Sequence, residues 1–370
     1  MKKTKVIAFY LPQFHEVEEN NKWWGEGFTD WKSARDAKPL FSGHVQPRIP
    51  LGKRYYNLLN KEVVEWQTQI AKKANVYGFC YYHYWFGNGK QILEKPAENL
   101  LKWKDIDQKF CFSWANQSWI RSWSKHNGNA WSGVQDASGA TDVIDGSGVL
   151  LQQVYGGEPE WKKHFEYLLP FFLDERYIKV NGKPMFLIHM AKDIPCLESM
   201  MRCFRKWARE AGLPGIHIVG TNAFEEELSC IDASVLFEPS YTYRNGKEFI
   251  IYRDVLQKRG KEAIKFYSYD YVWLKMLLRK KRISERVYLG GFTDFDTTPR
   301  HGKNGIVMLG AAAPKFARYF SLLIKKARKT GSEFVFVNAW NEWGEGAYLE
   351  PDEKNKYQFL RAIKKALEME

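Results

Sequence analysis

The sequence predicts an α/β protein whose 370 residues form one (β/α)₈ barrel of the TIM type. Three observations predict this fold. Eight short runs of β-branched and aromatic residues recur along the chain, and helical segments separate them. Polar side chains follow the end of each run. No stretch rich in proline, glycine and serine is long enough to act as a linker, so we expect residues 1–370 to be a single domain.

The eight predicted strands are short runs rich in β-branched and aromatic residues. In chain order they are residues 6–10, 76–82, 110–114, 185–189, 216–220, 233–237, 287–291 and 334–338. The intervening helices combine an apolar face with a lysine- and glutamate-rich face, and the clearest are residues 61–74, 161–173, 197–210, 315–329 and 357–368. Eight such units in a chain of this length favour a closed barrel over an open sheet.

Two of the predicted βα loops are long. Residues 16–57 follow the first strand and residues 115–157 follow the third, and both contain several tryptophans. Loops longer than about 15 residues in a compact domain usually carry function. We therefore expect these two loops to form the walls or lids of a site.

The carboxyl ends of barrel strands share one face, so side chains scattered through the sequence meet at one mouth. The polar residues that follow the predicted strands are Gln13, His15, His83, Asn116, Gln117, His189, Thr221, Asn222, Glu238, Asp294, Asp296, Asn338, Asn341 and Glu342. We expect a functional site where these side chains converge.

Aromatic residues make up 16% of the chain, with 15 tryptophans and 20 tyrosines. Trp and Tyr combine a flat apolar face with a hydrogen-bond donor, so an excess of them is typical of ligand sites. The apolar faces of sugar rings stack well on such side chains. Simple packing in the core is the alternative for many of them.

The net charge of +13 raises the question of an anionic partner. Much of the excess lies in residues 275–282, 315–329 and 354–365, whose spacing suits solvated helix faces, so we expect no nucleic-acid partner. No apolar run approaches the roughly 18 residues of a membrane-spanning helix. The five cysteines include no CxxC pair and lie mostly in apolar runs, which favours reduced thiols and a cytoplasmic protein.

The densest group of chemically useful residues is Asn-Ala-Trp-Asn-Glu-Trp-Gly-Glu-Gly, residues 338–346, directly after the last strand. Glu342 and Glu345 are three residues apart, so a turn, which Gly344 and Gly346 favour, would bring their carboxyl groups together. Two close carboxyl groups can differ in pKa, so that one holds a proton while the other is ionised, as acid/base chemistry at a glycosidic bond requires. The alternative is a glutamate pair that caps the following helix.

Other acidic residues allow two interpretations each. Glu238, which Pro239 follows, either contacts a ligand or forms an ion pair with a nearby arginine. Asp294 and Asp296 resemble a turn in which one aspartate pairs with Arg300, and they serve either the ligand or the fold. No histidine has a second histidine or cysteine at a ligand spacing, and GxGxxG, Walker and GxSxG motifs are absent, so we expect neither a metal nor a cofactor.

Eight segments spread over the whole chain carry a family resemblance. They read IAFYLPQFH, NKWWGEGFTDW, AKPLFSGHVQPRIPLG, YGFCYYHYWF, WANQSW, YIKVNGKPMFLIH, FDTTPR and NAWNEWGEGAYLEP. With these segments the chain resembles the glycoside hydrolase family 99-like proteins of the WbsX type, which are associated with O-antigen and capsule synthesis. The resemblance implies a single (β/α)₈ barrel, in agreement with the strand count.

The resemblance also implies roles for the glutamate pair. In the related family 99 endo-α-mannosidases, an Asn-Glu-Trp-His-Glu-Gly segment is similar to residues 341–346 here. By that similarity Glu345 would be the general acid that protonates the leaving oxygen. Glu342 would be the base that deprotonates the sugar's own 2-hydroxyl group, which gives retention through an epoxide-like intermediate. Gly344 stands where those enzymes have histidine, which removes one sugar contact.

The residues that we expect to build the sugar subsites lie in or near the same segments. They are Tyr10, Gln13, His15, Trp24, Trp31, His44, Tyr82, His83, Tyr84, Asn116, Gln117, Trp119, Glu238, Asp296 and Trp343. Gln117 departs from the family pattern, which commonly has glutamate there, and glutamine cannot take up a proton. Smaller departures are Asp30 in place of glutamate, and Phe295 and Thr297 in a segment that often reads Trp-Asp-Asn-Thr.

These observations predict a carbohydrate-active enzyme that cleaves or transfers a glycosyl unit, in an α-mannoside-like linkage, of a bacterial surface polysaccharide or its precursor. The expected partner is an oligosaccharide or polysaccharide; a lipid-linked one would bring peripheral contact with a membrane. One alternative is a sugar-nucleotide-dependent glycosyltransferase of lipopolysaccharide or capsule synthesis, with Arg121 and Arg300 at the donor. Another is a glycan-binding protein without turnover, which Gln117 favours. The sequence carries no signal for an oligomeric state.

Overall fold

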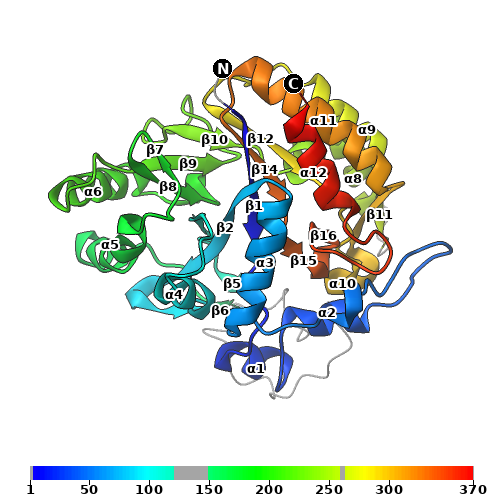
Figure 1. The fold of residues 1–370 in the computed structure, drawn as a ribbon, viewed down its shortest axis with the longest axis horizontal. Helices are drawn as coiled ribbons and strands as arrows, with labels where there is room; N and C mark the ends of the chain where they lie inside the picture. Colours follow the sequence, from blue (N-terminus) through cyan, green and yellow to red (C-terminus); the bar gives the residue numbers. More distant parts are fainter. Residues whose placement is uncertain (1–2, 121–148, 259–262, 370) are drawn as a thin grey trace.

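The computed structural model describes residues 3–120, 149–258 and 263–369 (Figure 1). Within these residues, eight parallel strands close into a barrel in which each barrel strand pairs with the next one along the chain. The strands are β1 (Lys5–Tyr10), β2 (Val76–Trp85), β4 (Phe110–Trp114), β8 (Lys183–Ile188), β9 (His217–Thr221), β10 (Ala233–Val235), β12 (Val287–Phe292) and β14 (Phe334–Asn338). The pairing of β1 with both β14 and β2 closes the ring, so the predicted barrel is confirmed.

The barrel strands coincide with the predicted ones, and β4 and β14 begin and end at the predicted residues. Shorter strands add to the loops. They are β3 (Gln91–Ile92), β5 (Trp119–Ile120), β6 (Val149–Leu151), β7 (Lys179–Val180), β11 (Lys265–Ser268), β13 (Ile306–Leu309), β15 (Asn341–Glu342) and β16 (Ala347–Tyr348). Of these, β11 and β13 form a separate parallel pair, and β15 and β16 form an antiparallel one.

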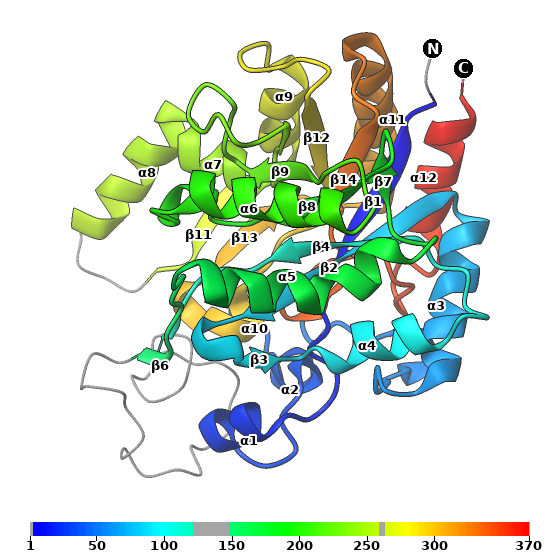
Figure 2. The same cartoon turned by 90° about the vertical axis from the view of Figure 1, so that its left-hand side faces the viewer.

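Helices surround the strands (Figures 1 and 2). The longer ones are α3 (Lys61–Lys73), α4 (Lys95–Lys102), α5 (Glu158–Leu173), α6 (Leu197–Glu210), α8 (Lys247–Lys258), α9 (Tyr269–Leu278), α11 (Ala313–Thr330) and α12 (Gln358–Glu368). Helix α6 matches its predicted bounds and buries Leu197, Met200, Phe204 and Trp207 at the helical spacing. Helices α4, α8 and α9 were not predicted.

Side chains of the strands alternate between the barrel interior and the surrounding helices. In the interior, the ring of Phe9 lies 5.0 Å from that of Phe237 and 5.4 Å from that of Phe336. On the outside, the neighbouring Tyr10 packs against Tyr81 at 4.2 Å between ring centroids. Adjacent residues of one strand therefore serve different layers of the fold.

The loops at the carboxyl ends of the strands carry short helices of their own, α1 (Glu18–Trp24), α2 (Asp30–Asp36), α7 (Ser240–Asn245) and α10 (Thr298–His301). Figure 2 shows α1 and α2 at one end of the barrel and both termini at the other. Much of the long loop after the third predicted strand, residues 121–148, lies outside the described residues. Over the described ranges, no helix has both the length and the apolar character that crossing a bilayer requires.

Candidate functional site

The loop after β14 brings Glu342 and Glu345 to the same side of the chain. A 3₁₀ turn, Trp343–Glu345, joins the two short strands of this loop and ends at Gly346. Gly346 has a φ of 61°, a left-handed value that glycine adopts without strain. The turn that the glycines predicted is present, and both carboxyl groups reach the side chain of Arg300.

Arg300, on α10, is the centre of an ion cluster. Its Nη1 donates to Glu345 Oε1 at 2.7 Å, and its Nη2 donates to Glu342 Oε2 at 2.8 Å. The same guanidinium reaches Asp30 of α2, with Nη2 at 3.0 Å and Nε at 3.2 Å from Oδ1. The side chain of Arg300 is only 7% exposed. One buried cation therefore joins three carboxyl groups from two distant loops.

The two glutamates differ in their surroundings. The side chain of Glu342 is 7% exposed and that of Glu345 is 24% exposed. Burial raises the pKa of Glu342 to about 8; Arg300 acts to lower it, whereas the charges of Glu345 and Asp30 raise it further. The neutral form of Glu342 is thus favoured near pH 7, and Glu345 is the more accessible of the two.

Two tyrosines of β2 lie near Glu342. The pKa values of Tyr82 and Tyr84 are raised, first by burial and then by the charge of Glu342. The ring of Tyr82 also lies 5.9 Å from that of Phe9 and 6.4 Å from that of His189, inside the barrel. Both tyrosines stay protonated and can donate hydrogen bonds at the mouth.

Trp343 is fixed from behind by a buried carboxyl group. Its Nε1 donates to Glu350 Oε2 at 2.8 Å, and its ring stacks on Tyr348 at 3.8 Å between centroids. Burial raises the pKa of Glu350 to about 7. Trp343 is 1% exposed, so its indole supports the glutamate loop and presents no open face to a sugar. We had expected Trp343 in a sugar subsite.

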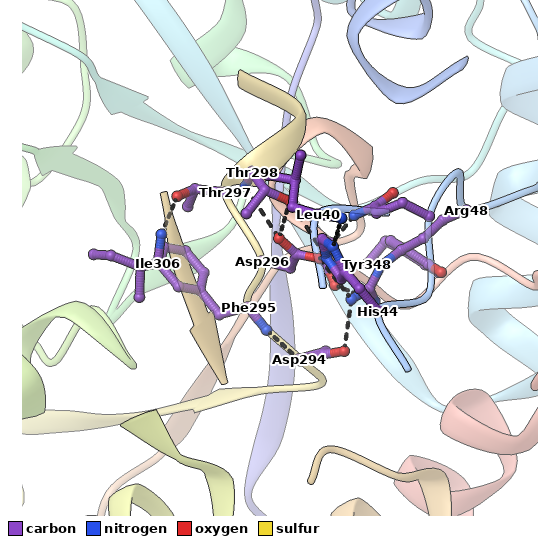
Figure 3. Close-up of polar contacts among 12 residues, drawn as sticks. Leu40, His44, Arg48, Asp294, Phe295, Asp296, Thr297, Thr298, Ile306 and Tyr348 are labelled. Atoms are coloured by element: carbon purple, nitrogen blue, oxygen red, sulfur yellow. Dashed lines mark hydrogen bonds and ion pairs between the residues drawn. The ribbon is translucent and has the colours of Figure 1, made fainter. Parts of the chain in front are cut away.

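Residues 40–48 form a segment that we call the strap, because it binds the loop after β12 (Figure 3). His44 Nε2 and Gln46 Nε2 lie 2.8 Å and 2.7 Å from Asp296 Oδ2. The backbone N–H of Leu40 donates to His44 Nδ1 at 3.0 Å, which assigns the proton to Nε2 and makes His44 a donor to Asp296. Burial alone would raise the pKa of Asp296, but the hydrogen bond from His44, the charge of Arg48 and the hydrogen bonds from Thr298 hold it at about 2.

Arg48 completes the strap. Its Nη2 lies 2.9 Å from Asp294 Oδ2 and 3.6 Å from Asp296 Oδ2. The sequence had predicted that Arg300 would pair with one of these aspartates. That prediction was wrong, because Arg300 turns toward Asp30 and the glutamates, and Arg48 takes its place. His44 and Asp296, expected to bind substrate, instead bind each other.

Tyr10 and His83 lie on the outer face of the barrel and not in its mouth, where we expected them. Tyr10 donates from its hydroxyl group to Gln67 Oε1 of α3 at 2.7 Å. His83 Nε2 lies 2.9 Å from His164 Nε2 of α5, and burial lowers the pKa of His83 to about 3. The predicted second strand ended before His83, whereas β2 continues to Trp85, so Tyr10 and His83 both lie within strands, and the alternation of side chains turns both outward.

The tryptophans expected to form sugar walls are buried. Trp24 and Trp119 are 1% and 6% exposed and pack on each other at 5.9 Å between ring centroids. Trp31 is 3% exposed, and its Nε1 donates to the carbonyl oxygen of Tyr56 at 2.8 Å. Among the described residues these rings fill the base of the loops, which is the core-packing alternative that the sequence left open.

Asn116 and Glu238 hold the ends of strands in place. Asn116 Oδ1 accepts from the backbone N–H of Met190 at 2.8 Å, and its Nδ2 donates to the carbonyl oxygen of the same residue at 3.0 Å. Glu238 is 1% exposed and pairs with Arg279 at 2.7 Å and with the Thr242 hydroxyl group at 2.9 Å. The ion pair proposed as the alternative for Glu238 is therefore present.

Several neutral polar groups at the strand ends are buried without a hydrogen-bond partner in the described part of the chain. They are Gln13 Nε2, Thr221 Oγ1 and both side-chain polar atoms of Asn338. Because buried polar groups are normally paired, such groups suit the hydroxyl groups of a bound sugar. His15 is buried beside them in sequence, with its pKa lowered by burial, and Gln117 is half-buried.

Four residues of the site were not among the predicted ones: Asp30, Arg48, Arg300 as a partner of the glutamates, and Glu350. Each lies in one of the segments that carried the family resemblance. Arg48 and Glu350 are single charges between apolar residues, a signal that could have identified them, whereas Asp30 and Arg300 have polar neighbours and carry no such signal. In the described ranges, no group of three or more His, Cys, Asp or Glu residues is arranged to hold a metal ion.

Curated relatives of the chain are two proteins named WxcX from strains of Xanthomonas campestris pv. campestris, each 28% identical over 98% of this chain. The alignment covers 49% of either relative, so the chain spans about half the length of the curated proteins it matches.

Solved structures share the fold. A glycoside hydrolase-like protein has a TM-score of 0.57 at 13% identity and covers 100% of this chain and 95% of its own. The GH99 endo-alpha-mannosidase from Bacteroides thetaiotaomicron has a TM-score of 0.52 at 15% identity, with 99% and 97% covered. The family model described as "Glycosyltransferase WbsX" matches residues 6–363. This match spans nearly the whole barrel and confirms the resemblance drawn from the motifs, and the chain therefore belongs to the WbsX glycosyltransferase family.

Proposed function

We propose that the protein is a carbohydrate-active enzyme that cleaves or transfers a glycosyl unit, in an α-mannoside-like linkage, of a bacterial surface polysaccharide or its precursor. Glu342 and Glu345 are the proposed acid/base pair. The observation that carries the proposal is their meeting on one side chain, 2.8 Å and 2.7 Å from the guanidinium of Arg300. The WbsX family match and the likeness in fold to the GH99 endo-alpha-mannosidase support the substrate class.

The roles within the pair follow from exposure and burial. Glu345, the more exposed carboxyl group, reaches the leaving oxygen as the acid, and Glu342 acts as the base. Because burial raises the pKa of Glu342 to about 8, its ionised form grows as the pH rises through that value. A base role therefore predicts a rate that increases from pH 7 to 9, and a falling rate would assign Glu342 as the acid instead.

The test is a screen of α-linked oligosaccharides with the wild type, Glu342→Gln and Glu345→Gln. Each substitution should lower the rate about 10²- to 10⁴-fold, the usual contribution of a positioned acid or base. Glu285→Gln, at an exposed glutamate, is the matched control and should retain the wild-type rate. Equal turnover by wild type and Glu345→Gln would remove the proposed acid.

Transfer from an activated donor is a second candidate, because the family description names a glycosyltransferase. Arg300, considered for the donor diphosphate, is already bound to three carboxyl groups, and Arg121 lies outside the described residues. Sugar-nucleotide cleavage that depends on a polysaccharide acceptor would favour this candidate over hydrolysis. Glycan affinity without product from any donor or acceptor would favour a binding protein.

All five cysteines are free, three of them buried. Free thiols persist in reducing compartments, so we propose action in the cytoplasm, on a polysaccharide precursor before export. Peripheral contact with a membrane is part of this proposal where the precursor is lipid-linked. Oxidised thiols in protein isolated from cells would contradict it.

A further inference from the structure

We propose that Arg300 is a positioning residue for the glutamate pair: its guanidinium fixes the carboxyl groups of Glu342 and Glu345 relative to each other and balances their charge. This inference rests on the proposed function, because it assigns Arg300 a part in preparing the acid and the base. Arg300 acts through the glutamates and not by touching the sugar.

The geometry of the guanidinium is the first argument. Nη1 serves Glu345 and Nη2 serves Glu342, so the spacing of the two nitrogens on one planar group sets the spacing of the two carboxyl groups. Asp30 accepts hydrogen bonds from Nε and Nη2 on the remaining edge of the guanidinium, and these bonds prevent the guanidinium from rotating. A lysine has a single charged nitrogen and cannot reproduce this arrangement.

The packing around Gly344 is the second argument. A Cβ atom at this position would lie 2.6 Å from Arg300 Nε and 2.9 Å from Asp30 Oδ1, closer than real contacts allow. The backbone N–H of Gly344 also donates to Asp30 Oδ2 at 3.1 Å. The turn that carries the glutamates is therefore built against the Arg300–Asp30 ion pair, and the absence of a side chain at Gly344 makes this approach possible.

Charge balance is the third argument. The groups that face Glu342 are Arg300, Glu345, Asp30 and the two tyrosines of β2. Burial, Glu345 and Asp30 all raise the pKa of Glu342, and Arg300 is the group that lowers it. Without this cation, the proposed base would hold its proton more tightly and would be neutral over a wider pH range.

An experiment that needs no substrate tests the role of Arg300 separately from the proposed function. Glutamate labelled with ¹³C at the δ carbon is introduced, and the carboxyl signals are followed from pH 5 to pH 11 by NMR. The signal lost in Glu342→Gln identifies Glu342. In Arg300→Met its titration midpoint should rise by about 1 to 3 pH units, the usual effect of a close opposite charge.

Two further variants make the test specific. Arg300→Lys keeps the charge, so its midpoint should stay closer to the wild type than that of Arg300→Met, and it serves if the methionine variant does not fold. Arg279→Met removes another largely buried arginine from its glutamate, Glu238, and should leave the midpoint unchanged. An unchanged midpoint in both Arg300 variants, or an equal shift in Arg279→Met, overturns the proposal.

With a substrate in hand, Arg300→Lys should lower kcat at least 10-fold, because the spacing of the acid and base is lost, while KM changes less. In Arg300→Met the limb of the pH–rate profile that reports Glu342 should move by the shift measured by NMR. A proportionate loss of folded protein with normal kcat for the remainder would instead mark a purely structural residue. If no substrate is found, the NMR titration still decides the role of Arg300.

Discussion

Replacing Glu350 by glutamine should remove a large pH dependence from the stability of the fold. Glu350 is 1% exposed and accepts hydrogen bonds from Tyr56 at 2.8 Å, Gln67 at 2.7 Å and Trp343 at 2.8 Å. Despite these donors, burial raises its pKa from 4.5 to about 7. The fold therefore prefers the neutral form of this carboxyl group.

The sign of the effect follows from linkage between protonation and folding. The pKa of Glu350 in the folded state lies above its value in the unfolded chain, so its stabilisation is complete below pH 4.5 and is lost as the pH rises through about 7. At about 1.4 kcal/mol for each pKa unit, the loss between pH 4 and pH 9 is about 3 kcal/mol. Glutamine cannot ionise, so Glu350→Gln should lack this decline.

The assay is urea unfolding followed by tryptophan fluorescence, for wild type and Glu350→Gln, at several pH values from 4 to 9. Subtracting the unfolding free energy of the wild type from that of the variant cancels the titration of other groups. Between pH 4 and pH 9 this difference should change by about 3 kcal/mol in favour of the variant. Glu285→Gln, which removes an exposed carboxyl group, is the control, and its unfolding free energy should follow that of the wild type at each pH. A difference that does not change with pH would refute the reasoning.

Three further outcomes are expected. Gly344→Ala should lower the unfolding free energy by about 1–3 kcal/mol because its Cβ has no room, whereas Gly157→Ala, with its nearest neighbour at 4.0 Å, should change it little in the same urea titration. A double-mutant cycle of His44→Ala and Asp296→Ala should give a coupling energy of about 1–3 kcal/mol, and strictly additive effects would contradict the strap contact. Burial lowers the pKa of His83 from 6.5 to about 3, so the stability that neutral His83 supports is present above pH 6.5 and is lost as the pH falls toward 3. His83→Phe cannot take up this proton and should stay folded to a lower pH in an acid titration followed by circular dichroism. An identical acid profile for wild type and variant would contradict this.

The fold was predictable because most residues of the barrel strands are buried and the strands leave short, mainly apolar runs in the sequence. β4 and β14 are entirely buried, and their bounds agree with the prediction. β11 was missed because its burial is mixed and its partner, β13, lies outside the barrel. Helix α9 was missed because its apolar residues are not confined to one face, which hides the helical period.

The candidate site was predictable in its location but not in its contacts. The glutamate loop and the strand ends follow from barrel topology. The direction of the Tyr10 and His83 side chains does not, because a shift of one residue along a strand turns a side chain to the opposite face and the sequence indicates strand ends only approximately. The pairing of Asp30 with Arg300 joins residues 270 positions apart and has no local sequence signal. Long-range ion pairs of this kind become visible only when the chain is folded.

The strap also limits how this part of the chain can change in length. His44, Gln46 and Arg48 are alternate residues, and all three point to the aspartates that follow β12. Inserting or deleting residues between His44 and Arg48 would displace at least one of these three side chains from its aspartate. Natural variants of this segment should therefore keep the spacing of the three residues unchanged.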